Sequence, residues 1–600
     1  MRFFIWLSLL VASQVLGVPT TSSKELVKRQ SSSKLVFAHF IVGIVWDRTG
    51  PSDWDADMQR AKAYGIDAFA LDIGTESNID QLLGDAYASA ANNGMKLFIS
   101  FDFGAGWSTG SASAVGAKIA QYASESAQLL VNGKPFASSF AGGGVDVSAV
   151  RSAAGIPIYF APNFYPGQDF SQIDSALSWG AWDSNGANKA PVPGGTTVTI
   201  EDNDNAYVSS LAGKPYVAPI SPWFFTHYGA EVSYPKNWVF PSDLLWYSRW
   251  ESILSLQPQF LEIITWNDYG ESHYIGPLSS KHGDDGASKW VNDMPHDGWL
   301  DMAKPFIAAY KAGASSPNAY IANDQLVYWY RPELKSLNCD STDTTMAAAD
   351  NSSGNYFHGK PDGWNTLSDS VFVVALLTQP GVVIIRSGDN TQTFDAPAGA
   401  TAYQVSMQVG QQQFTLSRNG NTVLSGVSLK DISATCICGE YNYNAFVGTV
   451  PLGFSDPLYS PDGFNVFTTG LNVACAPTPS LPATPAQPTT PPPTTMTGAP
   501  TMTTSAPTSV CTAGTTAPGN PDAGNQSGLC SYACNHGYCP AGPCVCTGYG
   551  AQVPEDPITG VAGYPLAGED ASYIGLCSYV YNHGYYPTGA CTTHSDGSPQ

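Results

Sequence analysis

The sequence predicts a multidomain chain whose main part is a (β/α)8 TIM-like barrel. Eight short apolar runs alternate with helical or loop patterns in its first half, all 12 cysteines lie from residue 339 onward, and residues 476–510 are nearly all Pro, Thr, Ser and Ala. A first half without disulfides needs a large packed core, whereas a Pro/Thr-rich segment cannot bury one. We expect a signal peptide (1–17), a propeptide (18–29), the barrel (30–315), a β-sandwich (316–475), a linker (476–510) and a disulfide-rich module (511–600).

The barrel prediction rests on where the apolar runs fall. They begin at or near Leu35, Gly65, Met95, Pro135, Ile156, Leu177, Pro215 and Leu261. Helical patterns, with apolar positions three and four apart, lie at 54–64 and 79–91. Eight runs in roughly 280 residues favour a barrel. An open doubly wound sheet is the alternative, but no run is followed by G-x-G-x-x-G.

The middle region has strand patterns only. Residues 371–377 and 382–385 are continuously apolar, residues 404–409 alternate with period two, and turn signals lie at 388–390 and 419–421. This pattern indicates a β-sandwich, which we expect to support the barrel; a second sugar-binding surface is the alternative role.

The N-terminus indicates a secreted protein. Met1-Arg2 and the apolar run 3–12 are typical of a signal peptide, and Lys28-Arg29 is a candidate dibasic processing site. No later run is long and apolar enough to span a membrane. Asn351 and Asn525 begin glycosylation sequons, which function only in a secreted chain. We expect an extracellular or cell-wall protein.

The amino-acid composition limits the classes of binding partner. The chain has 26 basic and 49 acidic side chains, a formal charge of −23, which argues against nucleic acid or an anionic membrane as partner. A neutral polymer remains compatible. Its 15 Trp and 30 Tyr suit sugar rings, although most should be core. There is no H-E-x-x-H motif, so we predict no metal and no cofactor.

Acidic residues follow two of the predicted strands. Asp102 ends the third run, and Asp268 and Glu271 follow the last one, three residues apart. Barrel chemistry takes place at the carboxyl ends of strands, and glycoside hydrolysis needs one protonated and one ionised carboxyl group. These three acids are our candidate catalytic residues. For Asp72 and Asp202, function and helix capping are equally balanced.

Other motifs compete with this interpretation. Residues 106–110 match the G-x-S-x-G elbow of serine hydrolases, with Ser108 as nucleophile, but Ser108 lies several positions past the strand. His39, His227 and His273 near strand ends are candidates for hydrogen bonds to sugar hydroxyls; structural roles are the alternative.

The blocks 35–43, 65–71, 96–102 and 266–271 resemble the barrel motifs of fungal α-1,3-glucanases, the mutanases of glycoside hydrolase family 71. The resemblance spans most of residues 35–335. It implies endo-hydrolysis of α-1,3-glucan with inversion, by Asp102, Asp268 and Glu271. Asp72 departs from the asparagine that the family often has there. The expected substrate-binding residues are His39, Asp72, Trp266, Asn267, Tyr269 and His227.

The roles of the acids are a hypothesis at this point. We expect Glu271 to donate the proton, Asp268 to orient water, and Asp102 to support one of them. The protein should act as a monomer on α-1,3-glucan. Two alternatives are a wall-binding protein that has lost turnover and, less favoured, a serine esterase using Ser108.

The C-terminal segment contains a repeat of period 47. Residues 528–532 and 535–538 recur at 575–579 and 582–585, and the stretch resembles carbohydrate-binding module family 24. Cys530 and Cys544 recur as Cys577 and Cys591, whereas Cys534 and Cys539 are replaced by Tyr in the second copy. Residues lost together are expected to be bonded together. The repeat predicts the pairs 530–544, 577–591, 534–539 and, for the remaining cysteines, 511–546.

Overall fold

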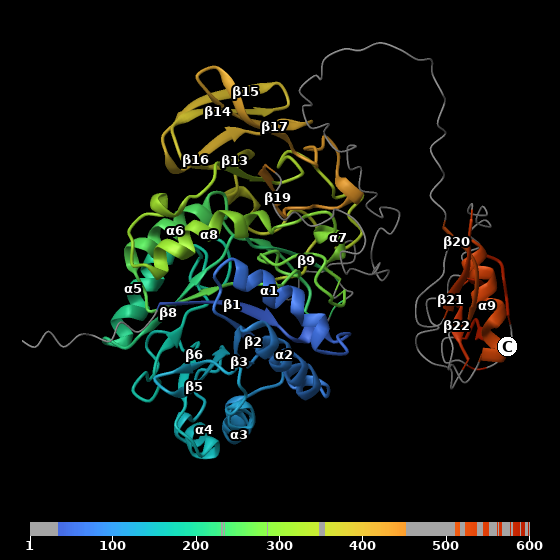
Figure 1. The fold of residues 1–600 in the computed structure, drawn as a ribbon, viewed down its shortest axis with the longest axis horizontal. Coiled ribbons are helices and arrows are strands. Elements are labelled where there is room, and N and C mark those ends of the chain that lie inside the picture. Colours follow the sequence, from blue (N-terminus) through green and yellow to red (C-terminus); the bar gives the residue numbers. More distant parts are fainter. Residues whose placement is uncertain are drawn as a thin grey trace, which may run out of the picture. The chain divides into compact units, whose positions relative to one another are not determined.

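The computed structural model describes residues 34–229, 232, 234–284, 286–346 and 354–451, and, between 510 and 598, residues 510–516, 523–536, 544–550 and scattered positions from 561 onward. The chain divides into two compact units, 1–485 and 486–600 (Figure 1). The division lies inside the predicted linker. The predicted signal peptide, the propeptide, nearly all of the linker, residue 351 and the side chain of residue 525 lie outside the described residues.

Eight parallel strands form a curled, TIM-like sheet in the first unit. Their order is β6-β5-β3-β2-β1-β11-β8-β7, with the short β4 (Leu130–Val131) antiparallel to β5. Each begins within three residues of a predicted start: β1 Leu35–Ile41, β2 Ala68–Ile73, β3 Lys96–Asp102, β5 Lys134–Phe140, β6 Tyr159–Pro162, β7 Ala176–Leu177, β8 Tyr216–Ile220 and β11 Phe260–Ile263.

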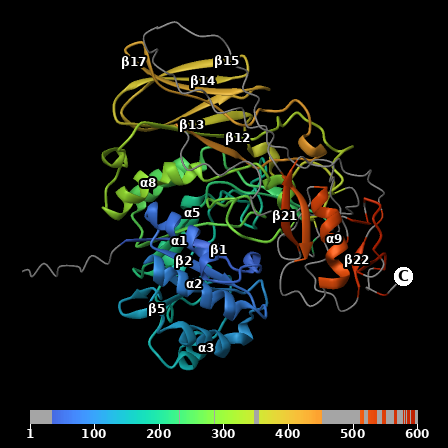
Figure 2. The ribbon, with the colours of Figure 1, turned by 45° about the vertical axis from the view of Figure 1, so that its right-hand side comes forward.

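Helices cover the outside of this sheet (Figures 1 and 2). The two predicted from periodicity are confirmed as α1 and α2. The α-helices are α1 Asp55–Ala63, α2 Ile79–Asn93, α3 Ala112–Tyr122, α4 Val147–Ala154, α5 Ile200–Leu211, α6 Leu245–Leu256, α7 Ser288–Val291 and α8 Gly298–Lys311. Short 3-10 turns are η1 Gly43–Val45, η2 Pro51–Trp54, η3 Thr109–Ser111, η4 Asn318–Tyr320, η5 Trp364–Thr366 and η6 Ile437–Gly439.

The strand–helix alternation is interrupted once. Residues 163–175, all described, connect β6 to β7 without a helix, because Pro166-Gly167 breaks helical structure there. The backbone N–H of Asp174 donates to the carbonyl of Phe160 (3.0 Å), and the Asn163 amide donates to the carbonyl of Leu177 (2.9 Å). These bonds connect the two outermost strands of the curled sheet.

The sheet encloses one apolar cluster to which all eight parallel strands contribute. Aromatic rings dominate it, and Phe37 and Phe98 meet edge to face at 4.9 Å. Residues two apart on a strand point the same way, so the interior side of β2 also carries Asp72, and that of β3 carries Ser100 and Asp102. The cluster comprises Phe37, Ala68, Ala70, Phe98, Leu129, Phe136, Tyr159, Ala161, Leu177, Val217 and Phe260.

The predicted antiparallel region consists of two four-stranded sheets. One is β16-β13-β12-β19 and the other β15-β14-β17-β18, and their inner faces share an apolar core. Trp329 and Phe372 also belong to the large core of the curled sheet, so the two parts pack together. The strands are β12 Gln325–Tyr330, β13 Ser370–Leu377, β14 Gly381–Ser387, β15 Asn390–Ala396, β16 Gly399–Ser406, β17 Gln412–Arg418, β18 Asn421–Val427 and β19 Phe446–Val450.

In the second unit, two predicted disulfides are confirmed. Cys530 is bonded to Cys544 and Cys577 to Cys591, each across 14 positions. The predicted pairs 534–539 and 511–546 involve side chains outside the described residues. In the first unit, Cys339 is bonded to Cys436. The elements are β20 Val510–Thr516, α9 Ala523–Asn535, β21 Cys544–Gly550, β22 Tyr564–Pro565 and β23 Cys591–Thr592.

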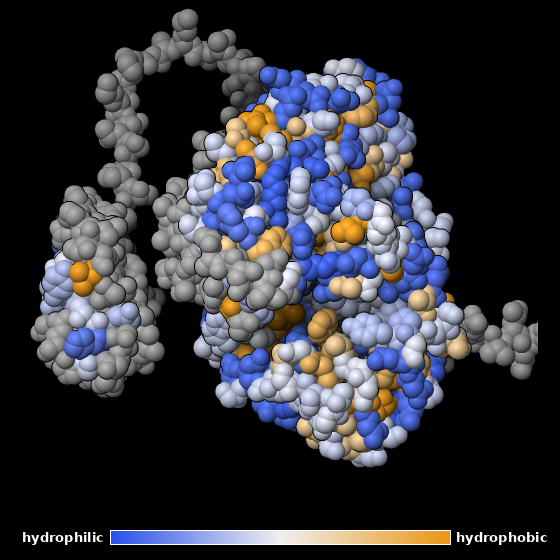
Figure 3. All heavy atoms as spheres, turned by 180° about the vertical axis from the view of Figure 1, so that it is seen from behind, coloured by the Kyte–Doolittle hydropathy of each residue, from blue (hydrophilic) through white to orange (hydrophobic). Residues whose placement is uncertain are grey.

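The surface of the first unit is mixed. On the face seen in Figure 3, apolar residues form small patches scattered among polar ones. Of the helices in the described part of the chain, none has the length and apolar character needed to cross a bilayer.

Candidate active site

The carboxyl ends of neighbouring strands bring the predicted acids to one end of the curled sheet. β11 lies beside β1, β1 beside β2, and β2 beside β3. In the register of these strands, Ile41 is opposite Asp72, and Asp72 is opposite Ser100, two residues before Asp102. Asp102 is the last residue of β3, whereas Asp268 and Glu271 lie on the segment that follows β11.

The segment after β11 is held by backbone contacts with β1. The N–H of Trp266 donates to the carbonyl of His39 (2.7 Å). The Asn267 amide donates to the carbonyl of Ile41 (3.1 Å) and accepts the N–H of the same residue (2.8 Å). Asn267 therefore mimics a strand residue and fixes where the following acids lie.

A tight turn brings Asp268 and Glu271 together. Thr265 Oγ1 accepts the N–H of Asp268 (2.8 Å), and Asp268 Oδ1 accepts the N–H of Glu271 (3.0 Å). His273 Nε2 lies 3.1 Å from Glu271 Oε2 and 3.7 Å from Asp268 Oδ2. One side-chain atom from each of these three residues lies within 4.8 Å of the other two. This turn thus places both acids on one side.

Glu271 lies between two basic groups. Its carboxylate forms an ion pair with Lys236 of the hairpin β9 (Phe225–Tyr228) and β10 (Lys236–Val239), and its other oxygen faces His273. Burial alone would raise the pKa of Glu271, but the Lys236 charge and the His273 hydrogen bond outweigh it and lower the pKa to about 2. Glu271 is therefore ionised at neutral pH.

A second charged cluster lies inside the sheet. His39 Nδ1 is 2.7 Å from Glu262 Oε1, and its Nε2 is 3.4 Å from Asp72 Oδ1. Burial lowers the pKa of His39, but these two carboxylates raise it to about 10. The imidazole is thus a buried cation between two acids. Its Nδ1 is bonded to Glu262 and its ring is fully buried, which favours a structural role over direct sugar binding.

Asp102 is placed next to this cluster. Burial raises its pKa, the negative charge of Asp72 adds to the effect, and Glu76 adds less; the 2.7 Å bond from the Gly104 N–H and the His39 charge oppose them. The resulting pKa is about 7. Asp102 can therefore hold a proton near neutral pH, unlike Glu271.

Four of the expected substrate-binding residues are buried and bonded within the protein. Both ring nitrogens of His227 are used, at 2.9 Å from Asn237 Oδ1 and 2.7 Å from Asp343 Oδ2. The Trp266 indole donates to Asp57 (2.9 Å), and the Tyr269 hydroxyl donates to the carbonyl of Pro277 (2.9 Å). With Asn267 anchored to β1, these contacts favour support of the site over contact with a sugar. A position at a strand end does not reveal whether a side chain bonds within the protein or contacts a ligand.

Two competing candidates have local structural roles. Asp202 and Thr199 form a capping box at the exposed N-terminus of α5. Ser108 caps η3, and its hydroxyl lies 3.2 Å from that of Ser111; within the described residues it has no histidine partner. The nucleophile–base pair of a serine hydrolase is therefore missing around Ser108 in this part of the chain.

Three charged residues of the two clusters were not predicted from the sequence. Glu262 is an acidic residue inside the otherwise apolar strand β11, and a buried acid of this kind is a sequence signal for a functional or paired group. Lys236 and Glu76 gave no such signal, because only the tertiary fold brings them to Glu271 and Asp102. Asp268, Glu271 and His273 could ligate a cation by their number and spacing. The Lys236 ammonium already neutralises Glu271, so we assign no metal here.

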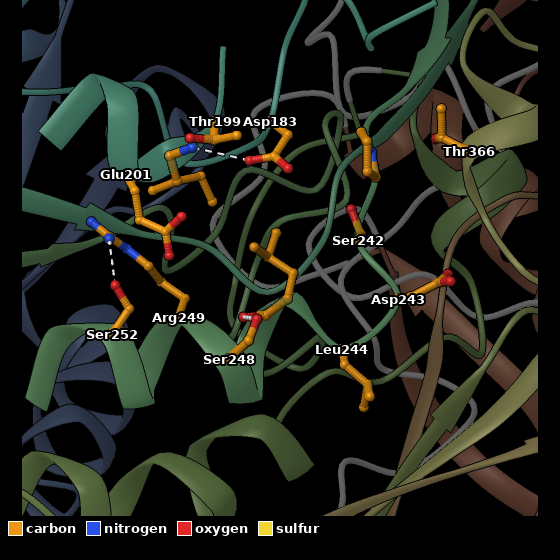
Figure 4. Close-up of a pocket in the computed structure, with 13 residues that line it drawn as sticks. Asp183, Thr199, Glu201, Ser242, Asp243, Leu244, Ser248, Arg249, Ser252 and Thr366 are labelled. Carbon is orange, nitrogen blue, oxygen red and sulfur yellow. Dashed lines mark hydrogen bonds between the residues drawn. The ribbon is translucent and has the colours of Figure 1, made fainter. Parts of the chain in front are cut away.

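A cavity of about 350 Å³ lies elsewhere, between the N-termini of α5 and α6 (Figure 4). Its lining includes Asp183, Glu201 and Asp243, and Asp183 accepts the N–H of Ile200 (3.0 Å) at the start of α5. None of the predicted site residues lines it. The candidate active site and this cavity are therefore separate features.

Comparisons with known proteins show which family the chain resembles. The profile of the family described as Glycosyl hydrolase family 71 matches residues 32–458. A mutanase of Penicillium rubens is 41% identical over 461 residues, covering 75% of this chain and 97% of the relative. A glucan endo-1,3-alpha-glucosidase of Schizosaccharomyces pombe is 37% identical over 448 residues, covering 71% and 96%. An ascus wall endo-1,3-alpha-glucanase of the same species is 26% identical over 456 residues, covering 69% and 96%.

Proposed function

The chain belongs to glycosyl hydrolase family 71, and on this basis we propose that it cleaves internal bonds of α-1,3-glucan. The observation that carries the proposal is the pair Asp268 and Glu271, held side by side after β11 with His273 within 4.8 Å. We propose that the curled sheet is a (β/α)8 barrel with its site at the carboxyl ends of the strands. The substrate is neutral, which fits the acidic chain.

Protonation states support a division of roles among the acids. A proton donor must be protonated before reaction, and the acid with a pKa of about 7 is Asp102. Glu271, with a pKa of about 2, is suited to accept a proton from water. We therefore assign donation to Asp102 and water activation to Glu271, with Asp268 holding Glu271 through its N–H. This assignment differs from the one expected from the sequence, where Glu271 was the donor.

Spacing argues against Asp268 and Glu271 as the acid–base pair. Inversion needs room for a water molecule, so the two carboxyl groups lie about 6.5–9.5 Å apart in inverting enzymes. The nearest oxygens of Asp268 and Glu271 lie within 4.8 Å, which is too close for an inverting pair. We therefore propose that Asp102, on a different strand, is the acid that acts with Glu271, at a carboxyl separation of about 6.5–9.5 Å. Inversion itself stays a proposal from the family.

The test uses insoluble α-1,3-glucan and, separately, a β-1,3-glucan. We expect new reducing ends from the first only, as oligosaccharides, with the β-anomer formed first in proton NMR spectra. Asp268→Asn and Glu271→Gln should lose nearly all turnover while remaining folded, whereas Asp202→Asn, at an exposed helix cap, should match wild type. A folded protein that binds the glucan without releasing ends would instead support the wall-binding alternative.

The rest of the chain completes the proposal. We assign the second unit to α-1,3-glucan binding, from its resemblance to carbohydrate-binding module family 24. Joining it to the enzyme by a linker raises the effective concentration of the polymer. We also propose that the protein is secreted, acts outside the cell or in its wall, and is a monomer. An N-terminal sequence starting after residue 17 or 29 in culture fluid would support secretion.

A further inference from the structure

Exposed aromatic rings in the first unit concentrate on loops that follow the barrel strands. Of the described residues, the rings exposed by more than a third there are those of Trp46, Tyr165, Tyr234 and Tyr320. Trp46 follows β1, Tyr165 follows β6, and Tyr234 lies between β8 and β11, so three of the four are on the side of the candidate active site. Tyr320 lies in η4, far along the chain from these loops.

Trp46 differs from the other tryptophans. Its side chain is 49% exposed, whereas each of the other 13 tryptophans that the structure describes is buried or half-buried. Its indole N–H makes no hydrogen bond to any described residue. Exposing a large ring to water costs free energy, because its apolar surface stays hydrated. An isolated exposed tryptophan at a strand end is therefore a candidate for ligand contact.

The ring of Trp46 is held in place from one side. It lies against the backbone of Gly283, where a Cβ atom would overlap the six-membered ring of the indole. The N–H of Gly283 donates to the carbonyl of Ile44 (2.8 Å), which ties the two loops together. Gly283 thus lets the ring lie flat on a backbone, with the rest of its surface open. Such a preorganised ring loses little entropy when a ligand stacks on it.

This ring is connected to the catalytic segment through the loop that contains His282 and Gly283. His282, next to Gly283, stacks on Tyr269 with ring centroids 4.2 Å apart, and Tyr269 is adjacent to Asp268. The loop of Trp46 also begins where β1 ends, at Ile41, which Asn267 binds. Trp46 is therefore placed beside the segment that carries Asp268 and Glu271.

We propose that Trp46 is a sugar-stacking platform that binds a glucose residue of the α-1,3-glucan chain next to the cleavage site. This inference rests on the proposed function. Polar residues flank the ring and Gly283 in the chain: Asp47 and Thr49 follow Trp46, and Lys281 lies two positions before Gly283. That combination suits a sugar, whose C–H face packs on the ring while its hydroxyls bind polar groups. A protein partner would call for a wider apolar patch.

The test measures kcat and KM on soluble α-1,3-gluco-oligosaccharides with the full-length protein. Trp46→Ala should raise KM roughly 10-fold to 50-fold, as expected for a tryptophan at a binding hot spot, with kcat changed much less. Trp46→Phe should recover part of the loss. The matched control is Tyr320→Ala, another exposed ring, which should leave both constants unchanged.

A second variant tests the geometry. Gly283→Ala adds only a methyl group, which displaces the ring, so KM should rise as well. In a Trp46→Ala background, Gly283→Ala should add nothing, because its effect acts through the ring.

If wild type releases no ends from α-1,3-glucan, the proposed function fails. If wild type is active and Trp46→Ala keeps its KM, or the two substitutions add, the platform is overturned while the proposed function stands.

Discussion

Two acids at the same end of the sheet differ in how readily they hold a proton. Asp102, at the end of β3, faces Asp72 and Glu76 and has a pKa raised to about 7. Glu271, after β11, faces Lys236 and His273 and has a pKa lowered to about 2. Burial raises both pKa values, so burial does not explain the difference. The sign of the neighbouring charges decides which acid keeps its proton.

The largest expected effect is on kcat, and it distinguishes the roles of Asp102 and Glu271 by comparing substrates with different leaving groups. Asp102→Asn should lower kcat on α-1,3-glucan by about 10²–10⁴-fold, the usual contribution of a general acid. On an α-1,3-gluco-oligosaccharyl fluoride, whose leaving group needs no proton, Asp102→Asn should stay near wild type. Glu271→Gln should lose activity on both substrates, because water activation is still required. Equal losses of Asp102→Asn on both substrates would reverse the assigned roles.

The next effect is on stability. A raised pKa means that folded protein binds the Asp102 proton more tightly than unfolded protein, so wild-type stability falls as pH rises from about 4 to about 7. Asp102→Asn removes this term. The variant should be more stable than wild type at pH 8 by on the order of 1–3 kcal/mol, allowing for partial exposure, and equal below about pH 4. Urea unfolding followed by tryptophan fluorescence at both pH values measures this; a variant less stable at pH 8 would contradict it.

A third change raises the pKa of Glu271, the acid with the low pKa. Lys236→Met removes the cation beside Glu271, so the pKa of Glu271 should rise by about 1–3 units. Because Glu271 must be ionised to accept a proton, the acidic limb of the kcat/KM profile should move to higher pH. At pH 4 the variant should lose more activity, relative to pH 6, than wild type does.

The matched control for this change is Lys189→Met. Lys189 also lies over the ring of Trp238, but its ion pair is with Asp362. Its removal should leave the acidic limb where it is. An unshifted limb in Lys236→Met would show that Lys236 does not set the charge of Glu271.

The smallest expected effect concerns Asp72. Three charged side chains act on Asp102: Asp72, Glu76 and the cation His39. Asp72→Asn removes the negative charge of Asp72, so the pKa of Asp102 should fall. The alkaline limb of the kcat/KM profile should move down by up to about one pH unit. Asp202→Asn removes an equal charge from an exposed helix cap and should not move it. A limb that moves up in Asp72→Asn would exclude Asp72 as a source of the raised pKa.

Much of the fold could be predicted from local sequence patterns. Apolar runs located all eight parallel strands, because a strand buried on both faces is apolar along its length. Two disulfides followed from the repeat. Pro166-Gly167 is a local signal for the missing helix between β6 and β7.

The sequence by itself determined where the strands begin, which acids follow them and which cysteines of the repeat pair. Only the tertiary structure decided the charge of each acid, because Lys236 is 35 positions from Glu271 in the chain and Glu262 is 223 from His39. It also decided that Asn267, Trp266 and His227 are bonded inward. Apolar periodicity is a property of neighbours along the chain, whereas a pKa depends on charges that meet only after folding.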